Sequence, residues 1–306
     1  MSAEPTHAKV AIDGMGMHWA ELASSSATPH APPLVLLHGI MDSYLTWSTV
    51  APLLATDRRV LMPDLFGCGL SDRPNASYAL EWHAEMIARW LEALGLTEVD
   101  VVGHSFGGGV AQMLLLACPE RVRRIALVAS GGLGRDVGFW LKLAAFPKAV
   151  EYFGQPFMSF GTRRTIGGAR QSSSAGDVDA LSAMNAKRGT ARAFSRTVRD
   201  VIRFGGQTRL FTHRASEVSV FPPIRVFWGD RDHLIPIAHG KSFVASTEGV
   251  ELEVFAGCGH YLHQERPEAF AKALRAFLDA AELPAARLRA AVAPRPGLAA
   301  RWLRSQ

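Results

Sequence analysis

The Gly-His-Ser-Phe-Gly stretch at residues 103–107 constrains the fold more than any other part of this chain. It joins a short apolar run, Val99–Gly103, to a longer one, Phe106–Cys118, which stops before a proline. A strand buried on both faces, followed at once by a buried helix, fits these two runs. The turn between them has to be tight, and glycines avoid clashes there. Ser105 is therefore predicted at a helix N-terminus, where backbone N–H groups and the helix dipole favour negative charge.

Eight short segments of the chain are typical of β-strands. Helical patterns lie between many of them, such as the apolar residues that recur every four positions from Trp82 to Leu94. Strands that alternate with helices predict an α/β fold, with a mostly parallel sheet of about eight strands covered by helices on both faces. The predicted strands are Lys9–Ile12, Met17–Leu22, Pro33–Leu37, Arg59–Pro63, Val99–Gly103, Ile125–Val128, Ile224–Trp228 and Leu252–Phe255.

The alternation of strands and helices breaks between residues 135 and 220. This segment is rich in Phe, Arg, Gly and Ser, and it is too long for a simple loop. We predict that it is a helical lid, inserted between two parts of the core, residues 1–134 and residues 221–282. Residues 283–306 form an Ala/Arg/Pro-rich C-terminal tail.

Composition and charge exclude several classes of protein. Apolar residues make up 48% and charged residues 20%, which suits a globular protein rather than a disordered one. Three cysteines without a CxxC pair argue against a disulfide framework or a structural zinc site. No secretory signal and no apolar run of roughly 18 residues is visible, so we expect a cytoplasmic protein.

The net charge of +5 is unevenly distributed along the chain. The tail contains five arginines from Arg287 to Arg304 and no acid after residue 283. Only one aromatic residue, Trp302, lies among these arginines, which is fewer than single-strand binding would need, so we expect no nucleic-acid partner. We expect at most weak contact between the tail and a membrane surface. The sequence leaves the oligomeric state open.

Four further segments, together with residues 103–107, resemble motifs of the α/β-hydrolase superfamily. His38-Gly39-Ile40 follows an apolar run and is similar to the oxyanion loop of that family. The segment from Asp64 to Ser71 resembles its D-x-x-G-x-G-x-S turn, which we predict to be structural. Residues 228–236 resemble its acid loop, and Gly259-His260 its histidine loop. The resemblance covers about residues 8–280 and is weakest across the predicted lid. It is highly specific for the fold and much less so for the substrate.

The resemblance implies a triad in the chain order Ser, acid, His. Ser105 is then the nucleophile, His260 the base that takes its proton, and Asp232 the acid that orients the imidazole. Two of these assignments have close competitors, Asp230 and His263. The family pattern places the acid four residues before a proline, which selects Asp232, and the Gly-His pair favours His260.

The same resemblance implies an oxyanion hole made of the backbone N–H groups of Ile40 and Phe106. We predict that His38 bonds to nearby loop backbone and that the cysteines are inert. We also predict a hydrophobic pocket between the edge of the sheet and the lid. Its expected lining consists of Met41, Leu133, Trp140, Leu234 and Tyr261, with Phe146 and Phe153 as further candidates to cap it.

A serine at the nucleophile position excludes relatives that need an aspartate there, namely haloalkane dehalogenases and epoxide hydrolases. The leading prediction is a carboxylic ester hydrolase that acts on a small hydrophobic substrate through an acyl-enzyme, without a metal or cofactor.

One alternative is a carbon–carbon bond hydrolase of ring-cleavage dienoates, because residues 130–134 resemble a segment of those enzymes. Their Ser/Gly-Pro-Gly oxyanion loop is missing, however, and Tyr261 replaces the tryptophan that often follows their histidine. A second alternative is a non-catalytic ligand-binding protein of the same fold.

Overall fold

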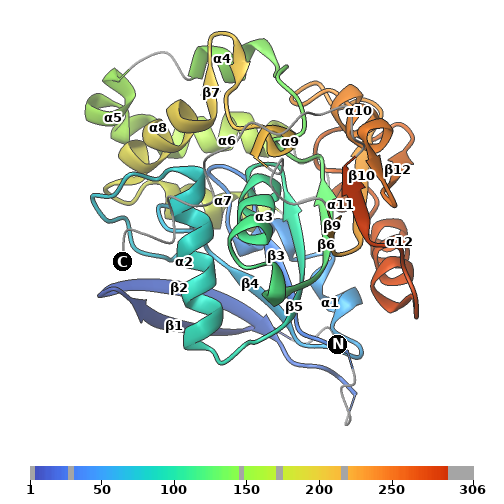
Figure 1. Cartoon of the computed structure of the whole chain (residues 1–306). Coiled ribbons are helices and arrows are strands. Elements are labelled where there is room, and N and C mark those ends of the chain that lie inside the picture. Colours follow the sequence, from blue (N-terminus) through green and yellow to red (C-terminus); the bar gives the residue numbers. More distant parts are fainter. Residues whose placement is uncertain (1–3, 27–30, 145–147, 170–174, 215–219, 289–306) are drawn as a thin grey trace, which may run out of the picture.

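The structure is a computed structural model, and it describes residues 4–26, 31–144, 148–169, 175–214 and 220–288. A central sheet contains β1 (Thr6–Ile12), β2 (Met15–Leu22), β3 (Leu34–Leu37), β4 (Val60–Pro63), β5 (Val99–His104), β6 (Val122–Val128), β10 (Ile224–Gly229) and β12 (Glu251–Phe255) (Figure 1). Their order is β1-β2-β4-β3-β5-β6-β10-β12. β2 runs antiparallel to both of its neighbours, β1 and β4, and the six strands from β4 to β12 in this order pair in parallel. The predicted eight-stranded, mostly parallel sheet is confirmed.

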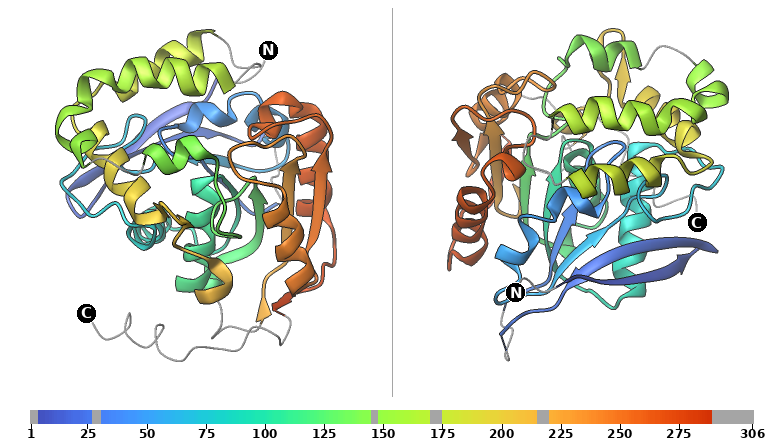
Figure 2. Two further views of the ribbon diagram at one scale, coloured as in Figure 1. Left: turned by 90° about the horizontal axis from the view of Figure 1, so that it is seen from above. Right: turned by 180° about the vertical axis from the view of Figure 1, so that it is seen from behind.

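Helices cover both faces of this sheet (Figures 1 and 2). On one face lie α2 (Leu80–Ala93) and α3 (Phe106–Ala117), which pack against each other. On the other lie α1 (Ala51–Leu54) and α12 (Pro267–Asp279). Ten successive residues of α3 are buried, because the helix is apolar almost all round. In contrast, α12 buries one stripe that includes Phe270 and Leu274, as its amphipathic pattern predicts.

The N-terminus of α2 is capped from a distant part of the chain. Ala79, which precedes the helix, has no side chain able to accept a hydrogen bond. Instead, Oδ2 of Asp200 accepts a hydrogen bond of 2.9 Å from the backbone N–H of Leu80. Asp200 lies on α8 (Thr190–Val201), so this contact joins α8 to the core. A carboxylate at a helix N-terminus is also favoured by the helix dipole.

The segment between β6 and β10, residues 135–220, is called the insertion below. It lies beyond the C-terminal ends of the parallel strands (Figures 1 and 2). Its described part is mostly helical, as predicted. Besides α8, it contains α4 (Phe139–Ala144), α5 (Ala149–Phe153), α6 (Met158–Ala169), α7 (Ala175–Asn185), α9 (Phe211–Arg214) and a hairpin of β7 (Ile202–Arg203) and β8 (Gly206–Gln207).

The first residues of the predicted tail pack on the body of the protein. β13 (Ala286–Leu288) pairs with β9 (Val220–Phe221) and β11 (Thr247–Glu248) in a small antiparallel sheet. Ala286 is fully buried, so the boundary at residue 283 is too early to separate a tail from the body. The arginines from Arg289 onward lie outside the described residues. Within the described part, no helix is both long enough and apolar enough to cross a membrane.

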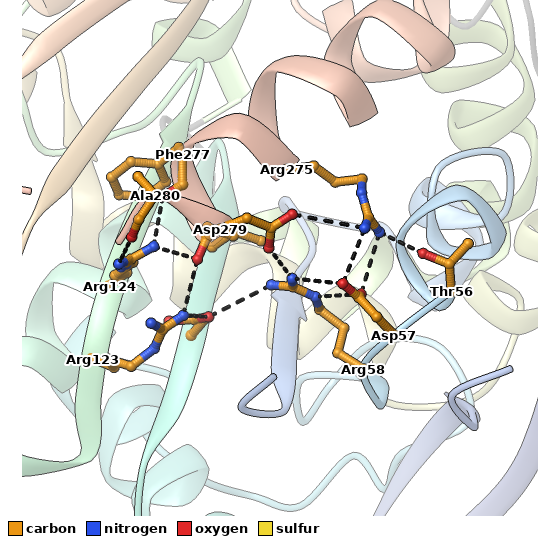
Figure 3. Close-up of polar contacts among 11 residues, drawn as sticks. Thr56, Asp57, Arg58, Arg123, Arg124, Arg275, Phe277, Asp279 and Ala280 are labelled. Carbon is orange, nitrogen blue, oxygen red and sulfur yellow. Dashed lines mark hydrogen bonds and ion pairs between the residues drawn. The ribbon is translucent and has the colours of Figure 1, made fainter. Parts of the chain in front are cut away.

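A network of charged groups lies at the N-terminal ends of the parallel strands, away from Ser105 (Figure 3). Arg123 donates to the buried carboxylate of Asp100 at 2.9 Å. Arg124 donates to the backbone carbonyl of Phe277 at 2.8 Å and also reaches the carbonyls of Leu278 and Ala280. The last carbonyls of a helix have no partner within the helix. Arg124 therefore satisfies the C-terminal end of α12 and fixes it to the start of β6.

Candidate active site

Ser105 lies on the turn between β5 and α3, with φ of 55° and ψ of −117°. A residue with a side chain is held in this positive-φ region only at a cost of about 1–3 kcal/mol. A Cβ atom at Gly103 would collide with the backbone of Gly107, and one at Gly107 would collide with the carbonyl oxygens of Leu37 and His38. The turn therefore requires both glycines, and it presents Ser105 at the edge of the sheet.

Asp232 and His260 are hydrogen-bonded to each other on neighbouring loops at the same edge. His260 Nδ1 lies 2.7 Å from Asp232 Oδ2, and both side chains are buried. Asp232 Oδ1 accepts backbone N–H bonds from Leu234 at 2.8 Å and Ile235 at 2.9 Å. These bonds orient the carboxylate, which accepts the Nδ1 proton of His260. His260 Nε2 is then the nitrogen that can act as a base.

Ser105 and His260 line one cavity of about 530 Å³. The oxyanion-loop segment passes directly beside the serine, because a Cβ at Gly39 would lie 3.3 Å from Ser105 Cβ. Ile40 and Phe106 also line the cavity. Phe106 is the first residue of α3, where backbone N–H groups have no acceptor within the helix. Both predicted oxyanion residues are therefore next to the candidate nucleophile.

The cavity is bounded by the edge of the sheet on one side and by the insertion on the other. Insertion residues on its wall are mostly apolar: Val137, Leu141, Met158, Phe194, Val201 and Ile202. Arg209 is the one Lys, Arg, Asp or Glu among the described lining residues. Its guanidinium lies 2.6 Å from Asp200 and 3.5 Å from Glu81, so its charge is largely compensated by these two carboxylates.

The structure places the predicted pocket residues in two groups. Met41, Leu234 and Tyr261 line the cavity. Leu133 does not belong to the described lining, because its side chain is packed in the hydrophobic core. Phe153 does not cap the cavity either, since its side chain is 75% exposed. The side chain of Trp140 and the whole of Phe146 lie outside the described part of the chain.

Two positions in the site were not predicted from the sequence. His104 Nε2 lies 3.0 Å from the backbone carbonyl of His260, to which it donates a hydrogen bond. The Glu265 carboxylate accepts from the backbone N–H of Gly259 at 3.0 and 3.1 Å. Together these contacts hold both ends of the Gly259-His260 pair. The sequence held no signal for either contact.

The competitors of the triad residues lie elsewhere. Asp230 is exposed, and it accepts a hydrogen bond of 2.7 Å from the backbone N–H of Gly257. His263 is fully buried, with its ring 4.6 Å from that of Trp47 and Nε2 3.2 Å from Thr46 Oγ1. Asp230 therefore braces a turn, and His263 packs in the interior. Neither residue is among the described lining of the cavity.

His38 bonds to loop backbone, as the sequence predicts. Its Nε2 accepts from the N–H of Leu65 at 3.0 Å, so Nδ1 carries the proton and donates to the Gly39 carbonyl at 2.7 Å.

Burial raises the pKa of the Cys258 thiol, and desolvation raises that of Cys68 to about 12. Neither thiol is poised as a nucleophile. Within the described residues, no group of His, Cys, Asp and Glu side chains could hold a metal ion.

The model of the alpha/beta hydrolase fold family matches residues 32–267, which include Ser105, Asp232 and His260. This chain belongs to that family. The match extends across the insertion, and the observed sheet agrees with the fold that the sequence motifs imply.

Several proteins resemble this chain over most of its length. An uncharacterized protein of Mycobacterium tuberculosis is 33% identical over 265 residues, 82% of this chain and 76% of that protein. A 2-hydroxy-6-oxo-2,4-heptadienoate hydrolase of Pseudomonas putida is 28% identical over 264 residues, 81% of this chain and 89% of that enzyme. Among solved structures, a haloalkane dehalogenase from Bradyrhizobium elkani has a TM-score of 0.78 at 22% identity, covering 90% and 98% of the two chains. This last likeness shows the fold alone.

Proposed function

We propose that this alpha/beta hydrolase is a serine hydrolase that cleaves carboxylic esters with a small hydrophobic acyl or aromatic group. The observation that carries the proposal is the arrangement of Ser105 and an Asp232-oriented His260 on one largely apolar cavity. The insertion acts as the lid of this cavity, since its apolar residues form the wall opposite the sheet edge. Such a cavity suits a substrate that is apolar apart from its reacting carbonyl.

The chemistry follows from the groups at the edge of the sheet. Ser105 Oγ attacks the substrate carbonyl while His260 Nε2 takes its proton, and Asp232 stabilises the imidazolium that forms. The backbone N–H groups of Ile40 and Phe106 bind the oxyanion of the tetrahedral intermediate. His260 then returns the proton to the leaving alcohol, which departs and leaves an acyl group on Ser105. Water attacks this acyl-enzyme with the help of His260 and releases the acid.

Carbon–carbon bond hydrolysis is the second candidate, because a heptadienoate hydrolase is 28% identical to most of this chain. Such a substrate carries a carboxylate, which needs a cationic partner inside the cavity. Arg209 is already paired with Asp200 and near Glu81, so little of its charge is left for an acidic substrate. This compensation favours a neutral ester over a dienoate.

The test is to measure turnover of p-nitrophenyl esters from acetate to dodecanoate, and of a ring-cleavage dienoate. The wild type and the Ser105→Ala variant are compared with each substrate. We expect ester hydrolysis that is lost in the variant and is faster than dienoate cleavage. Faster dienoate cleavage would replace the proposal by the second candidate. If neither substrate is turned over while an apolar ligand binds equally well to both proteins, the chain is a binding protein of this fold.

A further inference from the structure

Large hydrophobic side chains are exposed mainly on the insertion. Among the described residues, eight such side chains are exposed, and only Leu53 and Val254 lie on the body. The other six are all aromatic and all belong to the insertion. We call them the aromatic set: Phe139, Tyr152, Phe153, Phe157, Phe160 and Phe204, each between 66% and 79% exposed. Exposed apolar side chains gathered in one region mark an interaction surface rather than ordinary solvated surface.

The elements that carry the aromatic set lie next to one another. α5 packs on α8, α6 packs on the turn at residues 155–157, and α4 packs on β7. All of these elements lie on the side of the molecule beyond the C-terminal ends of the strands (Figures 1 and 2). The set is therefore exposed on the same segment whose other side chains, such as Leu141 and Phe194, line the cavity.

A basic groove of about 660 Å³ includes one member of the aromatic set, Phe204, in its lining. Its lining contains four cations, namely Lys142, Arg196, Arg199 and Arg203, together with the exposed ring of Phe204. Only one acid, Asp200, lines the groove, and it is paired with Arg209. Lys142 and Arg203 have no ion pair among the described residues.

The acid that neutralises the other two cations lies beneath the surface. Glu151 bonds to Arg196 at 2.7 Å and lies 3.4 Å from Arg199, and its own side chain is only 9% exposed. Both partner arginines are more exposed, at 27% and 30%. The groove therefore presents positive charge to the outside.

We propose that the aromatic set and the basic groove bind the surface of membranes that contain anionic lipids. Aromatic rings are favoured at the boundary between lipid head groups and acyl chains, and lysines and arginines near that boundary attract anionic head groups. Ile202 lines both the groove and the main cavity, so a membrane bound at the groove lies close to the cavity. Binding by this surface does not depend on Ser105.

Charge favours a membrane over a second copy of this chain. A two-fold interface places the same surface of both copies face to face. Lys142 and Arg203 of one copy would then approach those of the other, and like charges oppose such an association. Anionic lipids instead complement the four cations while the membrane accepts the aromatic rings.

The test is co-sedimentation of the full chain with vesicles of phosphatidylcholine alone and of phosphatidylcholine mixed with phosphatidylglycerol. We expect binding to the mixed vesicles that weakens as salt concentration rises. The double variant Lys142→Glu with Arg203→Glu should bind at least about tenfold more weakly, because two attractive charges become repulsive. The double variant Phe139→Ser with Phe204→Ser should also bind more weakly, at both low and high salt.

The matched control is Leu53→Ser with Val254→Ser, which removes the exposed apolar side chains of the body. It should bind like the wild type, and all variants should keep the wild-type melting temperature. Failure of the wild type to bind mixed vesicles would overturn the proposal, as would binding that is unchanged in both insertion variants. If the aromatic variant instead converts a dimer into a monomer on gel filtration without affecting vesicle binding, the surface is a self-association interface.

Discussion

His104 donates a hydrogen bond of 3.0 Å from Nε2 to the backbone carbonyl of His260. A carbonyl can only accept, so this bond places a proton on Nε2 of His104. The residue that precedes the candidate nucleophile therefore holds the backbone of the candidate base, across 156 positions of sequence. We therefore expect His104 to act as a positioning residue for His260.

Replacing His104 tests this positioning role. His104→Phe keeps a flat ring of similar size but removes the donor, and we expect kcat for a p-nitrophenyl ester to fall by about 10- to 100-fold, because small displacements of a catalytic group are costly. His104→Gln keeps an N–H donor and should recover much of that loss. The measurement is kcat against pH, and the pH profile of the Phe variant should shift as the surroundings of His260 change. Equal activity in both variants would show that the hydrogen bond is unimportant.

Asp232→Asn tests how the imidazole is oriented. Asn can still accept from Leu234 and Ile235 through its oxygen, but its NH₂ group then faces His260 Nδ1. His260 would be forced to carry its proton on Nε2, where it cannot take one from Ser105. We expect kcat to fall by about 10⁴-fold with little change in melting temperature. A fall in kcat of less than tenfold would mean that Asp232 is not the acid. The matched control is Asp230→Asn, which should leave kcat close to that of the wild type.

His83 should make the protein less stable in acid. It is buried, neither ring nitrogen has a hydrogen-bond partner among the described residues, and burial lowers its pKa from 6.5 to about 3. As pH falls below 6.5, the unfolded chain binds a proton on His83 that the folded chain does not bind until about pH 3. Folding stability is therefore lost across this window, by up to about 1.4 kcal/mol per pH unit.

The variant His83→Phe removes this titratable group, so the free energy of unfolding should depend less on pH. Urea unfolding at pH 7 and pH 5 should show a wild-type loss larger than that of the variant by about 1–2 kcal/mol. His213→Gln, at an exposed histidine, should behave like the wild type. An identical pH dependence in His83→Phe and the wild type would show that His83 is protonated in the folded protein.

Asp200 should stabilise the protein through the N-terminus of α2. Asp200→Ala removes the acceptor of the Leu80 N–H and the partner of Arg209, so we expect a loss of about 1–3 kcal/mol in the free energy of unfolding by urea. Asp179→Ala breaks an ion pair with Arg163 in which both side chains are more than half exposed, and it should cost less than about 1 kcal/mol. Similar losses in the two variants would contradict the capping role.

The sheet and the site loops could be predicted because their signals are local. A buried strand such as β5 is visible in the sequence as a short apolar run. The residues that follow it must lie at the carboxyl edge of a parallel sheet. The short strands β9, β11 and β13 have two or three residues each, too few to leave a periodic pattern. Their pairing joins segments that are far apart in sequence, which no local pattern encodes.

Side-chain positions within the insertion could not be predicted in the same way. Phe153 and Leu133 are both apolar, but the first is exposed and the second is packed in the core rather than on the cavity. Their positions depend on how the helices pack, which composition does not specify. The cap that Asp200 provides for α2 is hidden for the same reason, since donor and acceptor are 120 residues apart.

The most direct test of the central claim is whether Ser105 becomes covalently modified. The wild type and Ser105→Ala are treated with a fluorophosphonate, and the modified peptide is identified by mass spectrometry. The account predicts one adduct on Ser105, complete loss of ester hydrolysis in parallel with labelling, and no adduct in the variant. An active enzyme that stays unlabelled, or labelling that persists in Ser105→Ala, would contradict the assignment of Ser105 as the nucleophile.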